Sequence, residues 1–175
     1  YVDDVEAISE RLHREGLRLF NIVGKVVKPP HKMTAIWTHP KETSGQLEFA
    51  AYGDFIPDPR MESDWSSTPW LEQPLGIERA SHIGLVVGNL GKAKRLYCDV
   101  LGGTLIHEEQ ISGRKRSAFV AIGEDTVVEL AEPLSTNSPE GQELEKNGEG
   151  VFSLIFKTRD LGQAQDFLKS KQHQP

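Results

Sequence analysis

Residues 81–103 read SHIGLVVGNLGKAKRLYCDVLGG, and this stretch decides the expected fold. Its apolar start, Ser81 to Gly88, predicts a strand, and Leu90 to Leu101 carries its apolar residues on one side, which predicts a helix. Gly102 and Gly103 are expected to end that helix. Further strands are predicted at 104–110, 117–122 and 126–131. The unit therefore consists of one strand, one helix and three strands.

The first half of this unit occurs again near the end of the chain. Gly150 to Thr158 is a predicted strand and Leu161 to Lys171 a predicted helix, separated from the first unit by a short helix or turn at 139–146. Aligned with Ser153 at His82, the matched pairs are Leu161 with Leu90, Gly162 with Gly91, Ala164 with Ala93, and Leu168 with Tyr97. Such an internal repeat predicts an α+β fold built from repeated βαβββ modules.

The N-terminal segment repeats the helix and the three strands of the unit. An amphipathic helix is predicted at Asp3 to Gly16, with Val5 and Leu12 in the frame of the other two helices, and strands follow at 17–23, 33–38 and 46–51. Residues 55–76 hold four prolines without periodicity, which predicts a linker. We therefore expect three regions: 1–54, the second half of a domain whose first strand is missing; 55–76, the linker; and 77–175, a second domain with one full module and a module that stops after its helix.

Composition narrows the classes of function. The 175 residues carry a formal net charge of −6, and such an acidic balance argues against a nucleic-acid partner. No apolar run approaches the roughly 20 residues of a membrane helix. Cys98 is the only cysteine, which rules out an intrachain disulfide and points to a reducing, cytoplasmic setting.

Two groups of motifs carry a family resemblance. The first comprises His82-Ile-Gly-Leu-Val-Val, Asn89-Leu90, Lys92-Ala93 and Tyr97-Cys98-Asp99-Val100-Leu101-Gly102. It resembles the opening of a module of the vicinal oxygen chelate superfamily, which includes glyoxalase I, methylmalonyl-CoA epimerase, bleomycin-resistance proteins and extradiol dioxygenases. The second comprises Val2-Asp3-Asp4-Val5-Glu6-Ala7, Leu12-His13-Arg14-Glu15-Gly16, Thr38-His39-Pro40-Lys41 and Gly45-Gln46-Leu47-Glu48. It looks like the second module of a methylmalonyl-CoA epimerase-type domain.

The resemblance implies a cupped, barrel-like mixed sheet that holds a divalent metal ion. By motif matching, His82 is the first-strand ligand of the complete module, Glu129 its last-strand ligand, and Glu48 the last-strand ligand of the first segment. Imidazole and carboxylate suit Zn, Mn, Co, Ni, Mg or Fe(II), among which the choice stays open. A carboxylate between apolar strand residues also needs a cationic partner. We expect His82 and Glu129 to point into the same interior of the sheet.

Ser153 departs from the family pattern. An epimerase-like second module begins with a ligand histidine at this position, and serine is a poor ligand for these ions. Glu48 would share a metal with His82 and Glu129 only if the first segment pairs with the complete module, for instance across a dimer. The alternative for each glutamate is a solvent-facing position, because strand side chains alternate between two faces.

The remaining candidates have structural interpretations. His39 lies in a turn motif, Thr38-His-Pro-Lys, and is expected to be structural. His107, followed by Glu108-Glu109, is typical of a solvated, charged strand end. Cys98 lies in the predicted helix without a neighbour that would activate its thiol.

The leading hypothesis is a metal-dependent enzyme of glyoxalase or epimerase type. The metal would bind two neighbouring substrate oxygens and stabilise an enolate, while Glu48 or Glu129 abstracts the proton, giving isomerisation, epimerisation or lyase chemistry. One alternative is an extradiol ring-cleaving dioxygenase, which needs two histidines and one glutamate around Fe(II). The other is a non-catalytic binding protein of the bleomycin-resistance kind, which Ser153 favours. We expect a small-molecule substrate and a homodimer.

Overall fold

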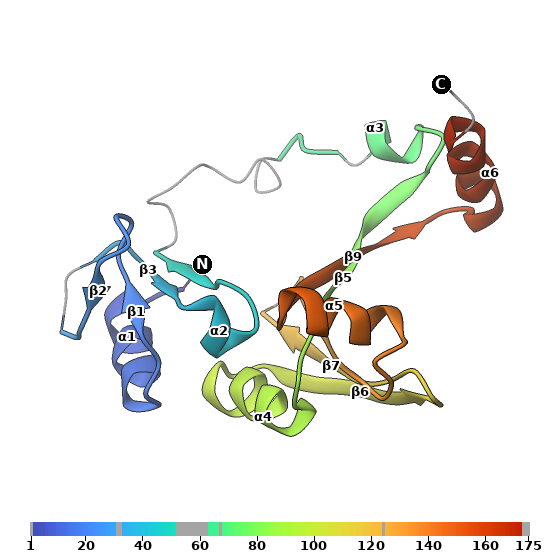
Figure 1. The fold of residues 1–175 in the computed structure, drawn as a ribbon. Helices are drawn as coiled ribbons and strands as arrows, with labels where there is room; N and C mark the ends of the chain where they lie inside the picture. The colour runs from blue at the N-terminus through green and yellow to red at the C-terminus, as the bar shows by residue number, and fades with distance from the viewer. Residues whose placement is uncertain (1, 31–32, 52–62, 67, 124, 173–175) are drawn as a thin grey trace.

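Two β-sheets with helices packed on them make up the described part of the chain (Figure 1). The computed structural model describes residues 2–30, 33–51, 63–66, 68–123 and 125–172. Strands and helices in both units confirm the predicted α+β class. None of the helices in these ranges combines the length and apolar character needed to cross a membrane.

The first unit is a four-stranded sheet with the order β2-β1-β3-β4. Its elements are α1 (Val5–Arg14), β1 (Leu19–Phe20), β2 (Val26–Val27), β3 (Ala35–Thr38), α2 (Pro40–Thr43) and β4 (Glu48–Ala50). The predicted strand at 17–23 is wrong in extent: it is shorter and turns back into β2. Asn21 explains the turn, because its side chain accepts hydrogen bonds from the N–H groups of Val23 and Lys25 at 3.2 and 2.9 Å.

The second unit is a five-stranded sheet with the order β6-β7-β8-β5-β9. Its elements are β5 (Ile77–Val86), α4 (Leu90–Lys94), η2 (Arg95–Val100), β6 (Thr104–Ile111), β7 (Lys115–Ile122), β8 (Thr126–Pro133), α5 (Pro139–Asn147), β9 (Gly150–Thr158) and α6 (Leu161–Gln172). β5 runs parallel to β8 and antiparallel to β9. The described strands form an open sheet and close no barrel.

The predicted linker at 55–76 lies partly outside the described residues. Its described part contains a short helix, α3 (Thr68–Leu71), which the sequence did not indicate. Trp70 on this helix is 60% exposed, so the tryptophan does not anchor the segment in a core.

A shared cap shows that the three helices of the repeat are equivalent. Each of α1, α4 and α6 begins after a side chain that accepts a hydrogen bond from the N–H three residues later, which satisfies one of the free donors of the first turn. The bonds run from Ala7 to Asp4, from Lys92 to Asn89 and from Gln163 to Asp160, at 2.9, 2.8 and 3.0 Å.

A shared strand register shows that the last strands of the two units are equivalent as well. The N–H of Val87 donates to the carbonyl oxygen of Ala131 at 2.9 Å, and the N–H of Val2 donates to that of Ala50 at 2.8 Å. Val2 thus lies parallel to β4 as β5 lies parallel to β8. Two residues before each acceptor stands a glutamate, Glu48 in the first unit and Glu129 in the second.

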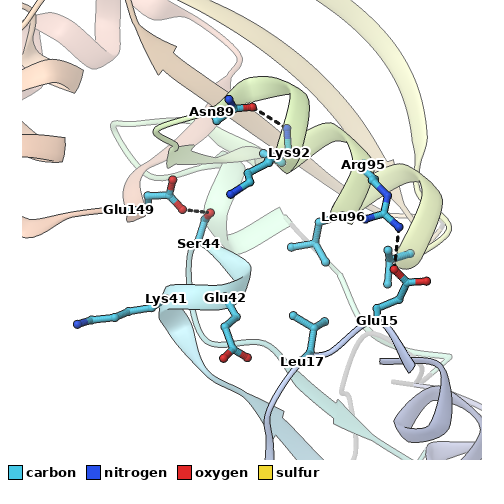
Figure 2. A pocket seen from close by; sticks show the side chains of 12 residues that line it. Glu15, Leu17, Lys41, Glu42, Ser44, Asn89, Lys92, Arg95, Leu96 and Glu149 are labelled. Atoms are coloured by element: carbon cyan, nitrogen blue, oxygen red, sulfur yellow. Dashed lines mark hydrogen bonds and ion pairs between the residues drawn. The ribbon is translucent and has the colours of Figure 1, made fainter. Parts of the chain in front are cut away.

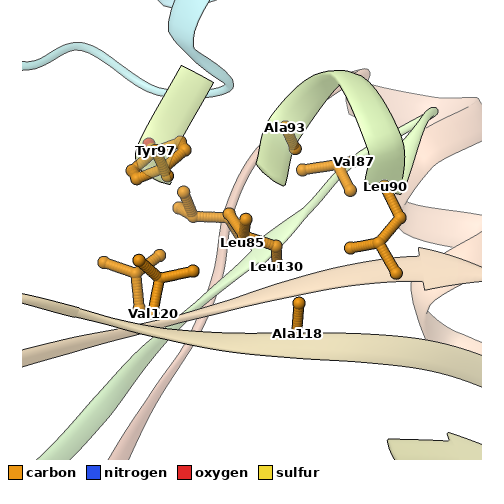
Figure 3. Close-up of a cluster of buried hydrophobic side chains, with 9 residues drawn as sticks. Leu85, Val87, Leu90, Ala93, Tyr97, Ala118, Val120 and Leu130 are labelled. Carbon is orange, nitrogen blue, oxygen red and sulfur yellow. The ribbon is translucent and has the colours of Figure 1, made fainter. Parts of the chain in front are cut away.

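One face of the five-stranded sheet is buried beneath α4 and η2 (Figure 3). The core side chains come from β5, β7, β8 and the helix: Leu85, Val87, Leu90, Ala93, Tyr97, Ala118, Val120, Val128 and Leu130. The predicted helix at 90–101 changes from α to π geometry, and the Leu101 N–H donates to the Leu96 carbonyl oxygen. Leu96 and Leu101 contact this core and also the core of the first unit.

The apolar stripe predicted on α6 is largely uncovered. Ala164 is buried, but Leu161 and Leu168 are 67% and 51% exposed. Their counterparts in the complete module, Leu90 and Tyr97, are buried against β7 and β8. Within the described residues no such strands lie against α6, so the stripe keeps its sequence pattern without the packing.

Tyr97 also joins the two units, and its hydroxyl donates to the Thr43 carbonyl oxygen at 2.9 Å in a buried setting. Burial raises the pKa of Tyr97, so the phenol stays a donor at ordinary pH. We expect Tyr97→Phe to lower the free energy of unfolding by about 1–2 kcal/mol, because the buried carbonyl loses its donor. Urea unfolding followed by fluorescence measures the change. A variant that unfolds at the parent's urea concentration would contradict the role given to this bond.

Candidate functional site

A row of residues crosses the sheet on the face opposite the core. Residues paired across neighbouring strands point to the same face. Phe119 lies opposite Glu129, Glu129 opposite Gly84, and Gly84 opposite Ser153. Leu130, next to Glu129 in the chain, belongs to the core beneath the helix. Strand alternation therefore places the whole row on the uncovered face.

A cavity of about 350 Å³ lies over this face. Each of five strands and α5 contributes one polar side chain to its lining. In chain order these residues are His82, Glu109, Lys115, Glu129, Glu140 and Ser153. The cavity thus collects side chains from positions spread over about seventy residues of sequence.

The carboxylate of Glu129 is the centre of the site. Its side chain is 6% exposed, and its Oε1 accepts hydrogen bonds from Ser117 Oγ, at 2.7 Å, and from Lys115 Nζ. Its Oε2 lies 3.6 Å from His82 Nε2. A buried carboxylate requires such partners. Here Oε1 contacts Lys115 and Ser117, and Oε2 faces His82.

Gly84 allows these side chains to approach. A Cβ added at residue 84 would lie 2.3 Å from Ser153 Oγ and 3.6 Å from Glu129 Oε2. Any larger residue would push Ser153 away from its place beside the carboxylate. Glycine at this position follows from the close packing of three strands rather than from a turn.

Arg114 and Glu140 form a second ion pair at the rim of the cavity. Glu140 is 1% exposed and accepts hydrogen bonds from Arg114 Nε at 3.1 Å and from Arg114 Nη2 at 2.7 Å. Burial by itself would raise the pKa of Glu140, but the hydrogen bonds and the positive charge of Arg114 outweigh burial and hold it below its ordinary value. Lys115 Nζ lies 3.9 Å from the same carboxylate.

The structure brings two of the three predicted site residues together. His82 and Glu129 face each other across the cavity, as the family resemblance implied. Glu48 lies exposed on β4 of the other sheet and is not part of the cavity lining. The first unit packs against the helix side of the second sheet, which is the side away from Glu129.

His39, His107 and Cys98, for which we expected structural roles, lie outside the lining of this cavity. His39 caps α2, and its Nδ1 accepts a hydrogen bond from the Lys41 N–H at 3.2 Å. His107 packs its ring against Phe119 at a centroid distance of 5.6 Å. Burial, and then the charge of Asp99, raises the pKa of the Cys98 thiol, which disfavours the reactive thiolate.

Five site residues were not found by sequence reasoning: Glu109, Arg114, Lys115, Ser117 and Glu140. Strand alternation could have separated Glu109 from Glu108, since neighbouring residues point to opposite faces. Glu108 indeed pairs with Lys94 of the helix at 2.7 Å, while Glu109 lines the cavity. For Lys115 and Glu140 the sequence holds no comparable signal, because their contacts depend on strand register and on the path of α5.

A second cavity, of about 520 Å³, lies at the junction of the two units (Figure 2). Its glutamates already have partners within the lining or close to it. Glu15 pairs with Arg95 at 2.9 Å, and Glu149 accepts a hydrogen bond from Ser44 at 2.7 Å. These contacts join the units, so we assign this cavity to the junction and the chemistry to the cavity above Glu129.

The comparisons agree with this fold. Residues 79–174 match the family model of the Glyoxalase/Bleomycin resistance protein/Dioxygenase superfamily. The match spans more than half of the chain, and the chain belongs to this superfamily. The resemblance read from the motifs is therefore confirmed at the level of the family.

The proteins similar to this chain include one bacterial relative and solved structures of methylmalonyl-CoA epimerases. The uncharacterized protein YqjC of Bacillus subtilis (strain 168) is 35% identical over 98 residues, covering 55% of this chain and 69% of the relative. Methylmalonyl-CoA epimerase from Mycobacterium tuberculosis is 31% identical, with a TM-score of 0.52, over 55% of this chain and 65% of that chain. A variant of the Streptomyces coelicolor epimerase in complex with 2-nitronate-propionyl-CoA is 28% identical, with a TM-score of 0.51, over 55% and 73%.

The family resemblance implies a divalent metal ion bound by side chains of this cavity. His82 Nε2 and Glu129 Oε2, 3.6 Å apart, have a spacing that two ligands of one ion can take. Within the described residues, however, no three His, Cys, Asp or Glu side chains are grouped to hold an ion. Lys115 also already bonds the carboxylate. A structural or catalytic ion takes about three or four protein ligands, so the residues present do not fit one.

We expect Glu140→Gln to destabilise the fold in a pH-dependent way. Because the pKa of Glu140 is lowered on folding, its carboxylate stabilises the fold above the ordinary pKa, and this contribution is lost as the pH falls through the folded pKa. The variant should lose roughly 1–3 kcal/mol at pH 7. Its difference from the parent should shrink as the pH drops below about 4.5.

Urea unfolding at pH 7 and at several lower values checks this. Glu145→Gln, an exposed carboxylate on the same helix, is the matched control and should behave as the parent does. An equal loss at every pH would show that Glu140 acts through packing and not through its charge.

Proposed function

We propose that the cavity binds a small carbonyl compound and transfers a proton at the carbon next to the carbonyl, as an epimerase or isomerase does. The family shows the fold, and the fold alone hosts many reactions. Two supports point to proton transfer in particular. One is the likeness to methylmalonyl-CoA epimerases, and the other is the state of the carboxylates in the cavity.

The free carboxylate of Glu109 is the observation that carries the proposal. Three glutamates line the cavity, and two have strong partners: Glu129 bonds Lys115, and Glu140 bonds Arg114. Glu109 lines the same cavity, and among the described residues no hydrogen bond or ion pair holds it. A general base needs a carboxylate oxygen open to the substrate proton, and of these three glutamates Glu109 is the one that no cation holds.

The sequence assigned the base to Glu48 or Glu129, and the proposal moves it to Glu109. In the proposed step the Glu109 carboxylate takes the proton from the substrate carbon. The electron pair of that C–H bond forms the C=C bond of the enolate, and the π pair of the carbonyl moves onto its oxygen. The carbonyl re-forms when a proton returns from Glu109 to carbon. Lys115 and Arg114 line the cavity and supply positive charge for the resulting enolate oxygen. Glu129 then serves to hold Lys115 in place.

The substrate class follows from the same groups. An acyl thioester with a second carboxyl or carbonyl group would present two oxygens to the cationic side of the cavity. One methylmalonyl-CoA epimerase neighbour, 28% identical, holds a compound of this kind, methylmalonyl-CoA. A CoA ester of a dicarboxylic acid is therefore the first substrate to test, and a homodimer in the cytoplasm remains part of the prediction.

A binding protein without catalysis is the second candidate. Ser153 favours it, because a hydroxyl stands at the position where the family pattern has a ligand histidine. A ring-cleaving dioxygenase has less support, since Fe(II) oxygenases use two histidines and one carboxylate and His82 is the one histidine in the cavity lining.

The test is the exchange of the substrate's carbon-bound proton for deuterium, with methylmalonyl-CoA in D₂O, followed by NMR. We expect exchange with the parent protein and a loss of roughly 10²- to 10⁴-fold with Glu109→Gln, because general base catalysis contributes that much. Glu108→Gln is the matched control, since this neighbour points to the other face and pairs with Lys94.

These measurements test the role of Glu109 and distinguish the enzyme from the non-catalytic binding protein. Equal losses in the two variants would contradict the role of Glu109. Tight binding by calorimetry with no exchange in the parent would replace the enzyme by the binding protein.

A further inference from the structure

We infer that the ammonium group of Lys115 is a built-in cation of this cavity and takes the place of a divalent metal ion on Glu129. The inference rests on the geometry of the site and not on the proposed reaction. It explains why Glu129 can stay buried and charged in a cavity whose side chains do not fit a metal ion.

The position of Lys115 is the first argument. It is the first residue of β7, its side chain is 13% exposed, and its Nζ bonds Oε1 of Glu129. Ser117, two residues along the strand and on the same face, bonds the same oxygen at 2.7 Å. An ion approaching Oε1 would have to displace both donors.

The charges around the pair are the second argument. Glu140 lies 3.9 Å from Lys115 Nζ, but Arg114 already neutralises Glu140 through its guanidinium. The positive charge of Lys115 is thus available to Glu129. A divalent ion would meet this ammonium across one carboxylate, and two like charges on one partner repel.

The ligands left for a metal are the third argument. With Oε1 occupied, His82 Nε2 and Glu129 Oε2 are the remaining donors of the predicted set in this cavity. Ser153 adds a neutral hydroxyl. An ammonium has three N–H donors, so Lys115 can hold Glu129 and still present a donor to an oxygen of a bound molecule.

The inference predicts that removing Lys115 uncovers a metal site. We expect the parent protein to bind Co²⁺ only weakly in equilibrium dialysis, and its melting temperature to stay unchanged with Co²⁺ or with chelator. Lys115→Met should then bind Co²⁺ roughly 10- to 100-fold more tightly than the parent, the scale on which neighbouring groups tune metal affinity. Its melting temperature should rise with Co²⁺, because the ion binds the folded state.

Four further variants show where the ion binds. Lys115→Arg keeps the positive charge and should gain nothing, while Lys115→Met combined with His82→Ala or with Glu129→Gln should lose the gain. Lys94→Met, which removes a half-buried lysine of another pair, should behave as the parent does.

Co²⁺ binding tests the role of Lys115 without any measurement of enzyme activity. Tight Co²⁺ binding by the parent, or a folded Lys115→Met with the parent's Co²⁺ affinity, would overturn it. If Lys115→Met does not fold, Lys115→Gln and the melting temperature of the parent with Co²⁺ give the same decision. A failure of deuterium exchange would leave these measurements unaffected, so the proposed function and this inference fail separately.

Discussion

The five-stranded sheet buries one face beneath the helix of its own module, and this asymmetry decides where the charged groups of the protein can lie. Leu85, Val120 and Leu130 point into the core, so their chain neighbours must point the other way. Glu129 follows from this alternation as a polar residue between two apolar chain neighbours, Val128 and Leu130. Because the helix covers the core face, the cavity with its carboxylates forms on the opposite face.

A buried carboxylate then needs a cation, and the structure supplies one from the next strand. β7 and β8 pair antiparallel, with Lys115 opposite Pro133 and Phe119 opposite Glu129. Lys115 therefore lies on the face of Glu129, and its long side chain reaches along the strand to the carboxylate. The same register brings Ser117 to the same oxygen. The fold can satisfy this carboxylate with its own ammonium, and this separates the chain from the metal-binding pattern that its motifs resemble.

The helix at 90–100 also ties the two units together. Tyr97 and Ala93 face the core of the second sheet, while Val100 packs with Leu12 and Ile36 of the first unit. The π-helical turn at Arg95–Val100 widens the helix where both faces are used. This packing places the first unit on the helix side of the second sheet, so Glu48 and Glu129 occupy equivalent strand positions but lie on separate sheets.

The sequence by itself determined the modules, since strand and helix periodicity and the caps Asp4, Asn89 and Asp160 are local signals. The family resemblance also implied that His82 and Glu129 share one side of the sheet, on two strands that pair in parallel. Only the tertiary structure decided that Lys115 holds Glu129 and that Glu109 stands free. Both facts depend on which residues face each other across strands distant in sequence, and periodicity along one strand does not contain that register.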